Sequence, residues 1–270
     1  MAGMGALAAE PPDPRSAGFV AALLAGAVGA VFAAQALVGD WLLAANLAIL
    51  CILAACAAAE RLWSYSVAWR PSARDMRTDL FFLAAVQAVL PLMVTTAVAA
   101  LAARAGAPAL RGIAGMAVAA QVAVLVLAFD LVQYWFHRAI HQVPALWRFH
   151  ALHHRPRKLY ALNAARAHPV EKLIQATLSS LALLPLGPST EALAVAIALA
   201  AAFDTLQHSN LPLRLGGLNL FLMGPELHRR HHSIVPATSN SNFGRLSPWP
   251  DLLFGTYKPP AAELDPLGVA

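Results

Sequence analysis

Four long apolar segments in the first half of the chain constrain its fold more than any other feature. They cover roughly residues 18–39, 41–59, 80–103 and 112–135. The third contains 24 consecutive residues without a charged side chain, which as a helix would rise about 36 Å and cross the hydrocarbon core of a bilayer. Backbone groups in lipid must be hydrogen-bonded within their own segment, so we expect each of the four to form a transmembrane helix.

The composition supports a membrane protein and excludes an ordinary soluble domain. Hydrophobic residues make up 59% of the chain and charged residues 12%, whereas soluble proteins average about 45–50% and about 25%. In a soluble protein, the formal net charge of +5 would fit a nucleic-acid partner. Here the basic residues flank apolar segments, which favours a membrane face, and we expect no nucleic-acid partner.

The positions of the arginines predict the orientation in the membrane. Asp40 alone separates the first two segments, so we expect a tight antiparallel hairpin that turns at Gly39. The loop at 60–79 holds four arginines and the loop at 104–111 holds two, so the positive-inside rule places 60–79 in the cytoplasm. The N-terminal tail and the end of the fourth segment then lie on the same side. We expect an integral multi-pass protein, in the plasma or inner membrane if its source is bacterial.

A further apolar region, 173–207, is interrupted. Pro185, Gly187 and Pro188 divide it into pieces of roughly 12 and 19 residues. The first piece is too short to span a bilayer, so we expect a helical hairpin that dips into the membrane and returns. The predicted fold class is all-α: a polytopic membrane bundle of four long transmembrane helices and a short proline-broken hairpin, with a cytoplasmic, helical, histidine-rich cap.

All ten histidines lie after residue 136, and eight of them form three closely spaced clusters. The clusters are His137 and His141 (HxxxH), His150, His153 and His154 (HxxHH), and His228, His231 and His232 (HxxHH). Residues three or four apart share a helix face, so each cluster directs its imidazoles towards a common point. Eight ligands are too many for one tetrahedral zinc and suit two metal ions, each with an open coordination position. Imidazole binds iron, copper, nickel and zinc, so ligand type alone does not select the metal.

Two further histidines and two carboxylates are weaker candidates. His208 ends the last apolar region, where it is either a ninth ligand or a favourable charge at a helix C-terminus. His168 precedes a proline and should lie outside a helix, as an extra ligand or as a residue that supports the ligands or a lid. Asp130 lies seven residues before His137, and Asp204 lies four before His208. Either carboxylate could accept a hydrogen bond from a metal-bound imidazole, or simply lie at the membrane interface.

The order HRAIH, then eight residues to HALHH, then HRRHH near the C-terminus resembles the fatty acid hydroxylase/sterol desaturase superfamily of membrane di-iron enzymes. Membrane acyl-CoA desaturases separate their first two clusters more widely. The resemblance covers about residues 120–258 and departs from the family where Pro250 separates Trp249 from Asp251. Further matching segments are His168-Pro169-Val170-Glu171, Asp204 to Ser209, Pro225-Glu226-Leu227, Asn242-Phe243-Gly244 and Leu253 to Tyr257.

The resemblance implies an O2-dependent oxidoreductase that uses two iron ions to hydroxylate or desaturate a C–H bond of a fatty acyl, sterol or related isoprenoid lipid. It places the metal ligands on the eight clustered histidines, with His208 as a further match. No separate nucleophile is implied. The chain contains no haem, flavin or iron–sulfur motif, so we expect a separate electron-transfer protein or reductase as partner. The expected organisation is a flexible tail without signal-peptide features at 1–17, a transmembrane bundle at 18–135, a catalytic region at 136–258 and a C-terminal tail at 259–270.

Two other classes of function remain open. One is a noncatalytic membrane protein that binds or transports divalent metal ions, although the histidines gather at one face rather than along a path across the bilayer. The other is a zinc hydrolase of lipids. A metalloprotease has less support, because no HExxH motif places a glutamate between paired histidines.

Overall fold

The computed structural model describes residues 12–104, 112–261 and 265–269. Within these ranges the secondary structure is helical, and the one β pairing is an isolated bridge between Ser233 and Leu267. Five of the described helices are long and apolar enough to cross a membrane. The predicted all-α membrane bundle with a histidine-rich cluster is thus confirmed.

The first two helices form the expected antiparallel hairpin. Helix α2 (Pro14–Val38) ends at Gly39, which adopts a left-handed conformation with φ of 71°, and Asp40 caps α3 (Trp41–Leu62) by accepting a hydrogen bond from the Leu43 amide at 2.7 Å. Glycine adopts this φ without the steric cost that a side chain would add. Helix α2 begins at Pro14, so the predicted tail at 1–17 is too long at its C-terminal end; its residues 1–11 lie outside the described part of the chain.

The third predicted segment is part of one longer helical stretch. Helix α4 (Ala73–Phe82) continues through a π-helical stretch, η2 (Leu83–Ala88), into α5 (Val89–Arg104). The start lies before residue 80 because Ser72 and Asp75 form a reciprocal capping box. Residues 105–111 of the next predicted loop lie outside the described residues.

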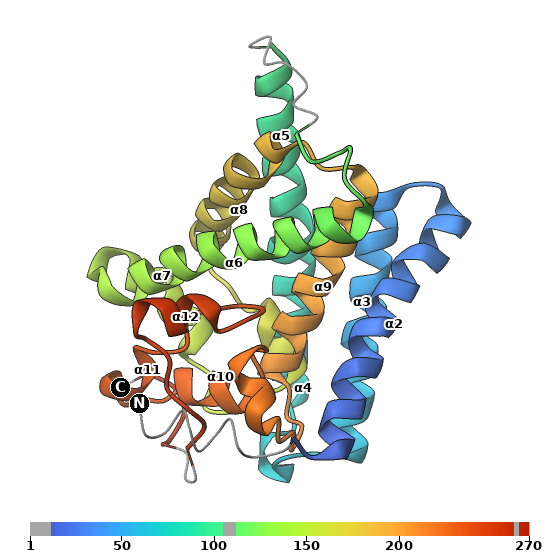
Figure 1. The fold of residues 1–270 in the computed structure, drawn as a ribbon. Coiled ribbons are helices and arrows are strands. Elements are labelled where there is room, and N and C mark those ends of the chain that lie inside the picture. The colour runs from blue at the N-terminus through green and yellow to red at the C-terminus, as the bar shows by residue number, and fades with distance from the viewer. Residues whose placement is uncertain (1–11, 105–111, 262–264, 270) are drawn as a thin grey trace.

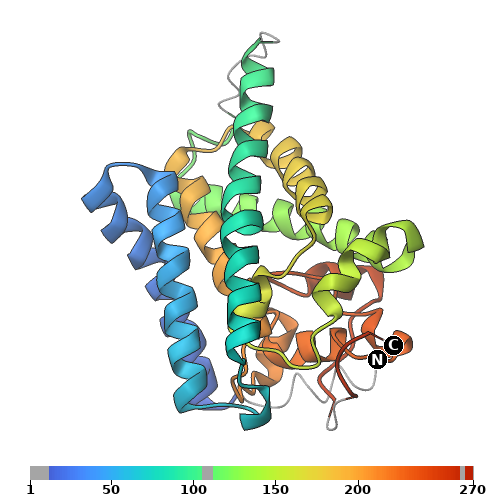
Figure 2. The same ribbon diagram turned by 180° about the vertical axis from the view of Figure 1, so that it is seen from behind.

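Helix α6 (Val118–Gln142) corresponds to the fourth predicted segment but runs across the bundle. It lies at a steep angle to α3 and α5 in both views (Figure 1, Figure 2). Its last turns carry the HxxxH cluster, and α7 (Pro144–His154) follows directly. The direction of α6 brings its C-terminal end to α7 and α12 (Trp249–Phe254) (Figure 1).

The interrupted apolar region forms two helices joined by a sharp turn. Helix α8 (Pro169–Leu183), the 3₁₀ turn η4 (Leu184–Leu186) and α9 (Thr190–His208) follow one another, with Gly187 in the left-handed conformation at the break. Helix α9 is itself long and apolar enough to span a membrane. A dip into the membrane and return remains a prediction. Close packing of α9 on α3 rests on small residues, including the fully buried Ala48 and Ala198.

Short elements form the cap at one end of the bundle (Figure 1). They are η1 (Val67–Trp69), η3 (Ala161–Ala165), η5 (Gly216–Leu220), α10 (Pro225–His231), α11 (Pro236–Ser239) and α12. Part of the predicted C-terminal tail packs against this cap, because Leu267 is buried and the Gly268 amide donates to the His232 carbonyl at 3.2 Å. Residues 262–264 and 270 of that tail lie outside the described part of the chain.

Candidate metal centre

Nine of the ten histidines gather in two groups whose ring nitrogens lie within 4.8 Å of one another in each group. The five-histidine group consists of His137, His141, His150, His154 and His231. The four-histidine group consists of His153, His208, His228 and His232. The groups therefore divide two of the sequence clusters. Histidines four apart stay together because they share a helix face, whereas the middle histidine of each HxxHH, His153 or His231, joins the other group.

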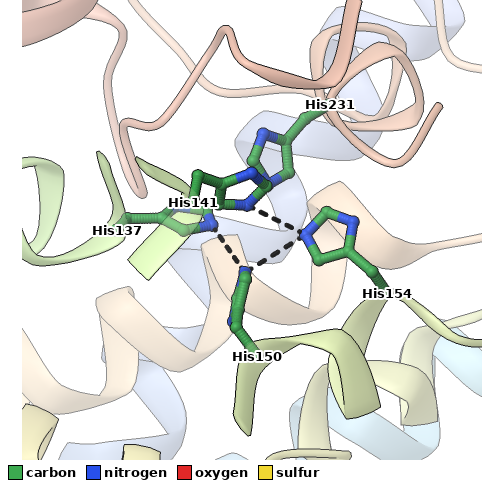
Figure 3. A group of neighbouring side chains, drawn as sticks. All are labelled: His137, His141, His150, His154 and His231. Carbon is green, nitrogen blue, oxygen red and sulfur yellow. Dashed lines mark hydrogen bonds between the residues drawn. The ribbon is translucent and has the colours of Figure 1, made fainter. Parts of the chain in front are cut away.

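The five-histidine group is assembled from three helices (Figure 3). Helix α6 supplies His137 and His141, α7 supplies His150 and His154, and α10 supplies His231. The Nε2 atom of His154 lies 3.2 Å from that of His141 and 3.1 Å from that of His150. The His137 and His150 Nε2 atoms are also 3.2 Å apart. Four lone-pair-bearing nitrogens thus converge on one small volume.

The four-histidine group forms a similar convergence from α7, α9 and α10. His208 Nε2 lies 3.1 Å from His153 Nε2 and 2.9 Å from His228 Nε2. The His228 and His232 Nε2 atoms are 3.0 Å apart. The prediction that His208 joins the clusters is consistent with this position at the last residue of α9.

Acceptors hold the opposite ring nitrogen, Nδ1, in five of the nine histidines. In four of them the acceptor is a backbone carbonyl group. The Phe243 carbonyl lies 3.0 Å from His137 Nδ1, and the Arg166 carbonyl lies 3.1 Å from His153 Nδ1. The Asp204 carbonyl lies 2.7 Å from His208 Nδ1, and the Ser241 carbonyl lies 2.8 Å from His231 Nδ1. A carbonyl oxygen only accepts, so each Nδ1 carries the proton and each Nε2 presents its lone pair to the group. The buried His231 Nε2 has no hydrogen-bond partner among the described residues. This donor set fits a cation at each group.

Burial keeps the imidazoles neutral. It lowers the pKa of His153, His154, His228 and His232 well below the usual value, with neighbouring histidines adding to the effect. Burial likewise lowers the pKa of His231 to about 3. A metal ion requires the neutral form as ligand, so these groups are ready to bind at neutral pH.

His168 lies apart from both groups. It is the N-cap of α8, where its Nδ1 accepts a hydrogen bond from the Val170 amide at 3.1 Å, and its ring packs against Phe149. The expectation that it lies outside a helix is confirmed. Neither histidine group includes His168, so the structure gives no support to the interpretation as an extra ligand, and a role in supporting the ligands or a lid stays a prediction.

The roles expected for the two aspartates also require correction. Asp130 accepts hydrogen bonds from the Leu246 and Ser247 amides at 2.8 and 2.9 Å, and the Phe243 carbonyl faces His137 instead. Seven residues of helix separate Asp130 from His137 by about 10 Å along the axis, which is beyond the reach of a short carboxylate. The Asp204 side chain pairs with Arg245, and its backbone carbonyl contacts His208.

Three carboxylates that sequence reasoning did not assign support the groups. Glu171, in the first turn of α8, accepts from His150 Nδ1 at 2.9 Å. Asp79 accepts from Arg166 Nε at 2.6 Å, and the carbonyl of that arginine holds His153. Glu60 accepts from the Ala161 amide at 2.6 Å and from the Asn210 amide at 2.7 Å. The available signal was an acidic residue at the edge of a long apolar segment, which is a functional candidate by default.

Asp251 supports the same site from α12. It accepts from the Phe243 amide at 2.8 Å and from the Gly244 amide at 2.7 Å, which holds the segment that contacts His137. Pro250, where the sequence departs from the family pattern, occupies the first turn of α12. Proline is tolerated there because the first helical amides need no intrahelical acceptor.

A small cavity touches both histidine groups. Its lining includes His137 and His150 from the five-histidine group, and His153, His208 and His228 from the other. Its volume of about 40 Å³ accommodates O2 or a few water molecules. Reactants in this cavity would therefore lie beside both candidate metal positions.

The comparisons with known proteins cover the region that holds these groups. A sequence profile described as fatty acid hydroxylase matches residues 122–256, half of the chain and all nine histidines. Ornithine lipid hydroxylase OlsE of Rhizobium tropici is 36% identical over 137 residues, which cover 50% of this chain and 41% of that protein. Alkylglycerol monooxygenase of Danio rerio is 36% identical over 136 residues, 49% of this chain and 29% of that protein.

A more distant relative is a Delta(7)-sterol-C5(6)-desaturase of Nicotiana tabacum, 28% identical over 150 residues, 53% of this chain and 51% of that protein. The chain thus spans about half or less of the length of these curated relatives. No solved structure matches significantly.

Proposed function

The chain belongs to the fatty acid hydroxylase family, and we propose that it is an integral membrane oxidoreductase that uses two iron ions and O2 to hydroxylate or desaturate a C–H bond of a lipid. The observation that carries the proposal is the pair of buried histidine groups that share one cavity. Relatives whose names specify an ornithine lipid, an alkylglycerol and a sterol support a lipid substrate. We assign the substrate to fatty acyl, sterol or related isoprenoid lipids.

We assign one iron to each histidine group. Imidazole is a suitable ligand for iron, and each group offers at least four. When bound, the two ions would supply the oxygen-activating chemistry, which side chains alone do not provide. Activation of O2 also requires electrons, which we assign to a separate electron-transfer protein or reductase that meets the cap on the cytoplasmic face.

The side chains of the site have three tasks. The carbonyl partners and Glu171 fix the tautomer of five histidines, so that their Nε2 atoms point inward. Six of the nine histidines are buried, which limits the access of bulk water to the reacting atoms and so suppresses side reactions. The cavity borders both groups, so that O2 bound in it would lie beside both.

The proposal is tested by iron analysis and lipid profiling of the full chain. Purified protein should contain two iron ions, and membranes supplied with O2 and a reductase should gain lipids heavier by one oxygen or lighter by two hydrogens. His154→Ala should lower the iron content to one ion and abolish the lipid change, whereas His168→Asn, which preserves the helix cap outside both groups, should retain two ions and the lipid change.

Absence of iron together with unchanged lipids would contradict the proposal. Metal flux into proteoliposomes without O2 consumption would instead identify a transporter. Lipid hydrolysis under anaerobic conditions would identify a zinc hydrolase.

A further inference from the structure

The cavity beside the histidine groups contains two buried hydrogen-bond acceptors without donors. Gln207 is 2% exposed and Glu171 is 8% exposed, and both line the cavity. Gln207 Oε1 and Glu171 Oε2 find no hydrogen-bond partner within the described ranges. An acceptor left unpaired in a buried site costs its full desolvation free energy, so the pair indicates a ligand that donates hydrogen bonds.

The neighbouring contacts determine which atoms are free. The Gln207 amide nitrogen donates to Asp204 Oδ1 at 3.1 Å. A carboxylate only accepts, so this contact fixes the orientation of the amide and leaves its oxygen unused. Glu171 Oε1 accepts from His150 at 2.9 Å, which leaves Oε2 unused.

Other amides of the same wall are satisfied. Gln175 donates to Gln133 Oε1 at 2.7 Å and accepts from Lys172 Nζ at 2.7 Å, and Gln133 donates to Ser179 at 2.8 Å. The two free acceptors are therefore exceptions among the buried side-chain oxygens of this wall, and the other unpaired buried side-chain atom of the lining, among the described residues, is the ring nitrogen His228 Nδ1. Phe136, Ile140, Ala164 and Ala167 form an apolar part of the lining.

We propose that the substrate lipid carries two hydrogen-bond donor hydrogens, on two hydroxyl groups or on one amide NH2 group, close to the carbon that is oxidised, and that one donates to Gln207 Oε1 and the other to Glu171 Oε2. This inference rests on the proposed function and specifies its substrate. The apolar wall would receive the adjoining carbon atoms. A plain methylene chain or an ether at this position would leave both acceptors unpaired.

The local charge favours a neutral donor over an ammonium group. Lys172 and Arg245 already act on the Glu171 carboxylate as positive charges, and His150 donates to it. A third cation would be repelled by both basic side chains. Hydroxyl and amide groups donate a hydrogen bond without this repulsion.

Binding measurements on the full chain in phosphatidylcholine nanodiscs test the proposal without turnover, O2 or reductase. The probes are hexadecane-1,2-diol and palmitamide, each compared with its fully methylated counterpart, 1,2-dimethoxyhexadecane or N,N-dimethylpalmitamide. Affinity is measured by displacement of tritiated hexadecane-1,2-diol. We expect the wild type to bind at least one donor probe about tenfold more tightly than its methylated form.

Gln207→Leu removes one acceptor and should reduce this preference to about twofold or less, with little change in affinity for the methylated probes. Gln175→Leu is the matched control, because it makes the same chemical change in the same lining at an amide whose polar atoms are both engaged. Co2+, which imidazole also binds, serves as a substitute for iron. The number of cobalt ions bound per chain should be the same in Gln207→Leu as in the wild type, which verifies that the histidine groups are intact.

Equal binding of donor and methylated probes by the wild type would overturn the proposal, as would an unchanged preference in Gln207→Leu. A donor preference in a protein that does not oxidise lipids would retain the binding site and reject the oxidoreductase assignment. Oxidation of a lipid by a protein without donor preference would retain the oxidoreductase assignment and reject the donor-binding site.

Discussion

The helices upstream of the family match, residues 12–104, and the matched region, residues 122–256, contribute to the metal centre in different ways. The matched region supplies all nine histidines. The upstream region contains no histidine, but it supplies two buried carboxylates, Glu60 from α3 and Asp79 from α4. Both form hydrogen bonds to the matched region rather than to their own helices.

The upstream helices therefore support the site as well as forming part of the bundle predicted at 18–135. Asp79 holds Arg166, whose carbonyl faces His153, and Glu60 holds the amide of Asn210, two residues after His208. Two members of the four-histidine group are therefore positioned through the upstream helices. Burying a charge in an apolar bundle is costly unless it is paired. The presence of these two carboxylates is therefore explained by their hydrogen bonds to the matched region.

The largest expected effect comes from removing a histidine of the matched region. His228→Ala deletes a nitrogen that lies 2.9 Å from His208 Nε2 and 3.0 Å from His232 Nε2. We expect the bound iron to fall from two ions to one and lipid oxidation to fall by more than about 100-fold, because a lost ligand costs more than a lost supporting contact. Iron analysis that still finds two ions would contradict the assignment of an ion to this group.

Asp79→Asn tests the upstream contribution most sharply. It leaves the Arg166 guanidinium without its charge partner, which should destabilise the protein by about 3–5 kcal/mol. Affinity for the second metal ion should fall about 10–100-fold as His153 loses its fixed orientation, measured by cobalt titration. Asp75→Asn lies on the same helix as Asp79, where it breaks the part-exposed pair with Lys158 and weakens the helix cap with Ser72. It should leave cobalt affinity unchanged.

If both variants behave alike in the cobalt titration, the upstream helices do not position the site. Recovery of cobalt affinity in Asp79→Glu would show that the carboxylate itself is required. A purely structural role would lower the melting temperature of Asp79→Asn without changing its cobalt spectrum.

Acid should destabilise the metal-free protein through the matched region, because the upstream region has no histidine. The His231 pKa of about 3 lies below its ordinary value of 6.5. Below pH 6.5 the unfolded chain therefore binds protons that the folded chain does not, and stability falls as the pH falls from 6.5 towards 3. We expect a loss of about 1.4 kcal/mol per pH unit from this residue once the pH is well below 6.5. Equal urea midpoints at pH 7.5 and pH 5 would contradict this.

Glu60→Gln should have the smallest effect of the four. The amide oxygen can still accept from the Ala161 and Asn210 amides, while the loss of charge weakens both hydrogen bonds. We expect a destabilisation of about 1 kcal/mol in urea unfolding, with two iron ions retained. A loss of iron comparable to that of Asp79→Asn would show that the charge of Glu60, rather than its geometry, maintains the site.

The predictable features of this protein are local in the sequence. Apolar length predicted the helices, Gly39 predicted the first turn, and the spacing of four between His150 and His154 predicted a shared direction. Each depends on residues within a few turns of one another. The assignment of Asp130 to His137 failed because periodicity describes the face of a helix but not the distance along it.

The sequence alone determined that the chain is a membrane helical protein with a dense set of histidines, because apolar length and i,i+4 spacing are properties of a single helix. Only the tertiary structure decided how the HxxHH clusters are divided, which carbonyl groups orient the imidazoles, and which carboxylates support them. The contact between Glu60 and Ala161 joins residues 101 positions apart. Contacts of this kind arise from the packing of α3, α4 and α9 against the cap, and no local sequence pattern specifies them.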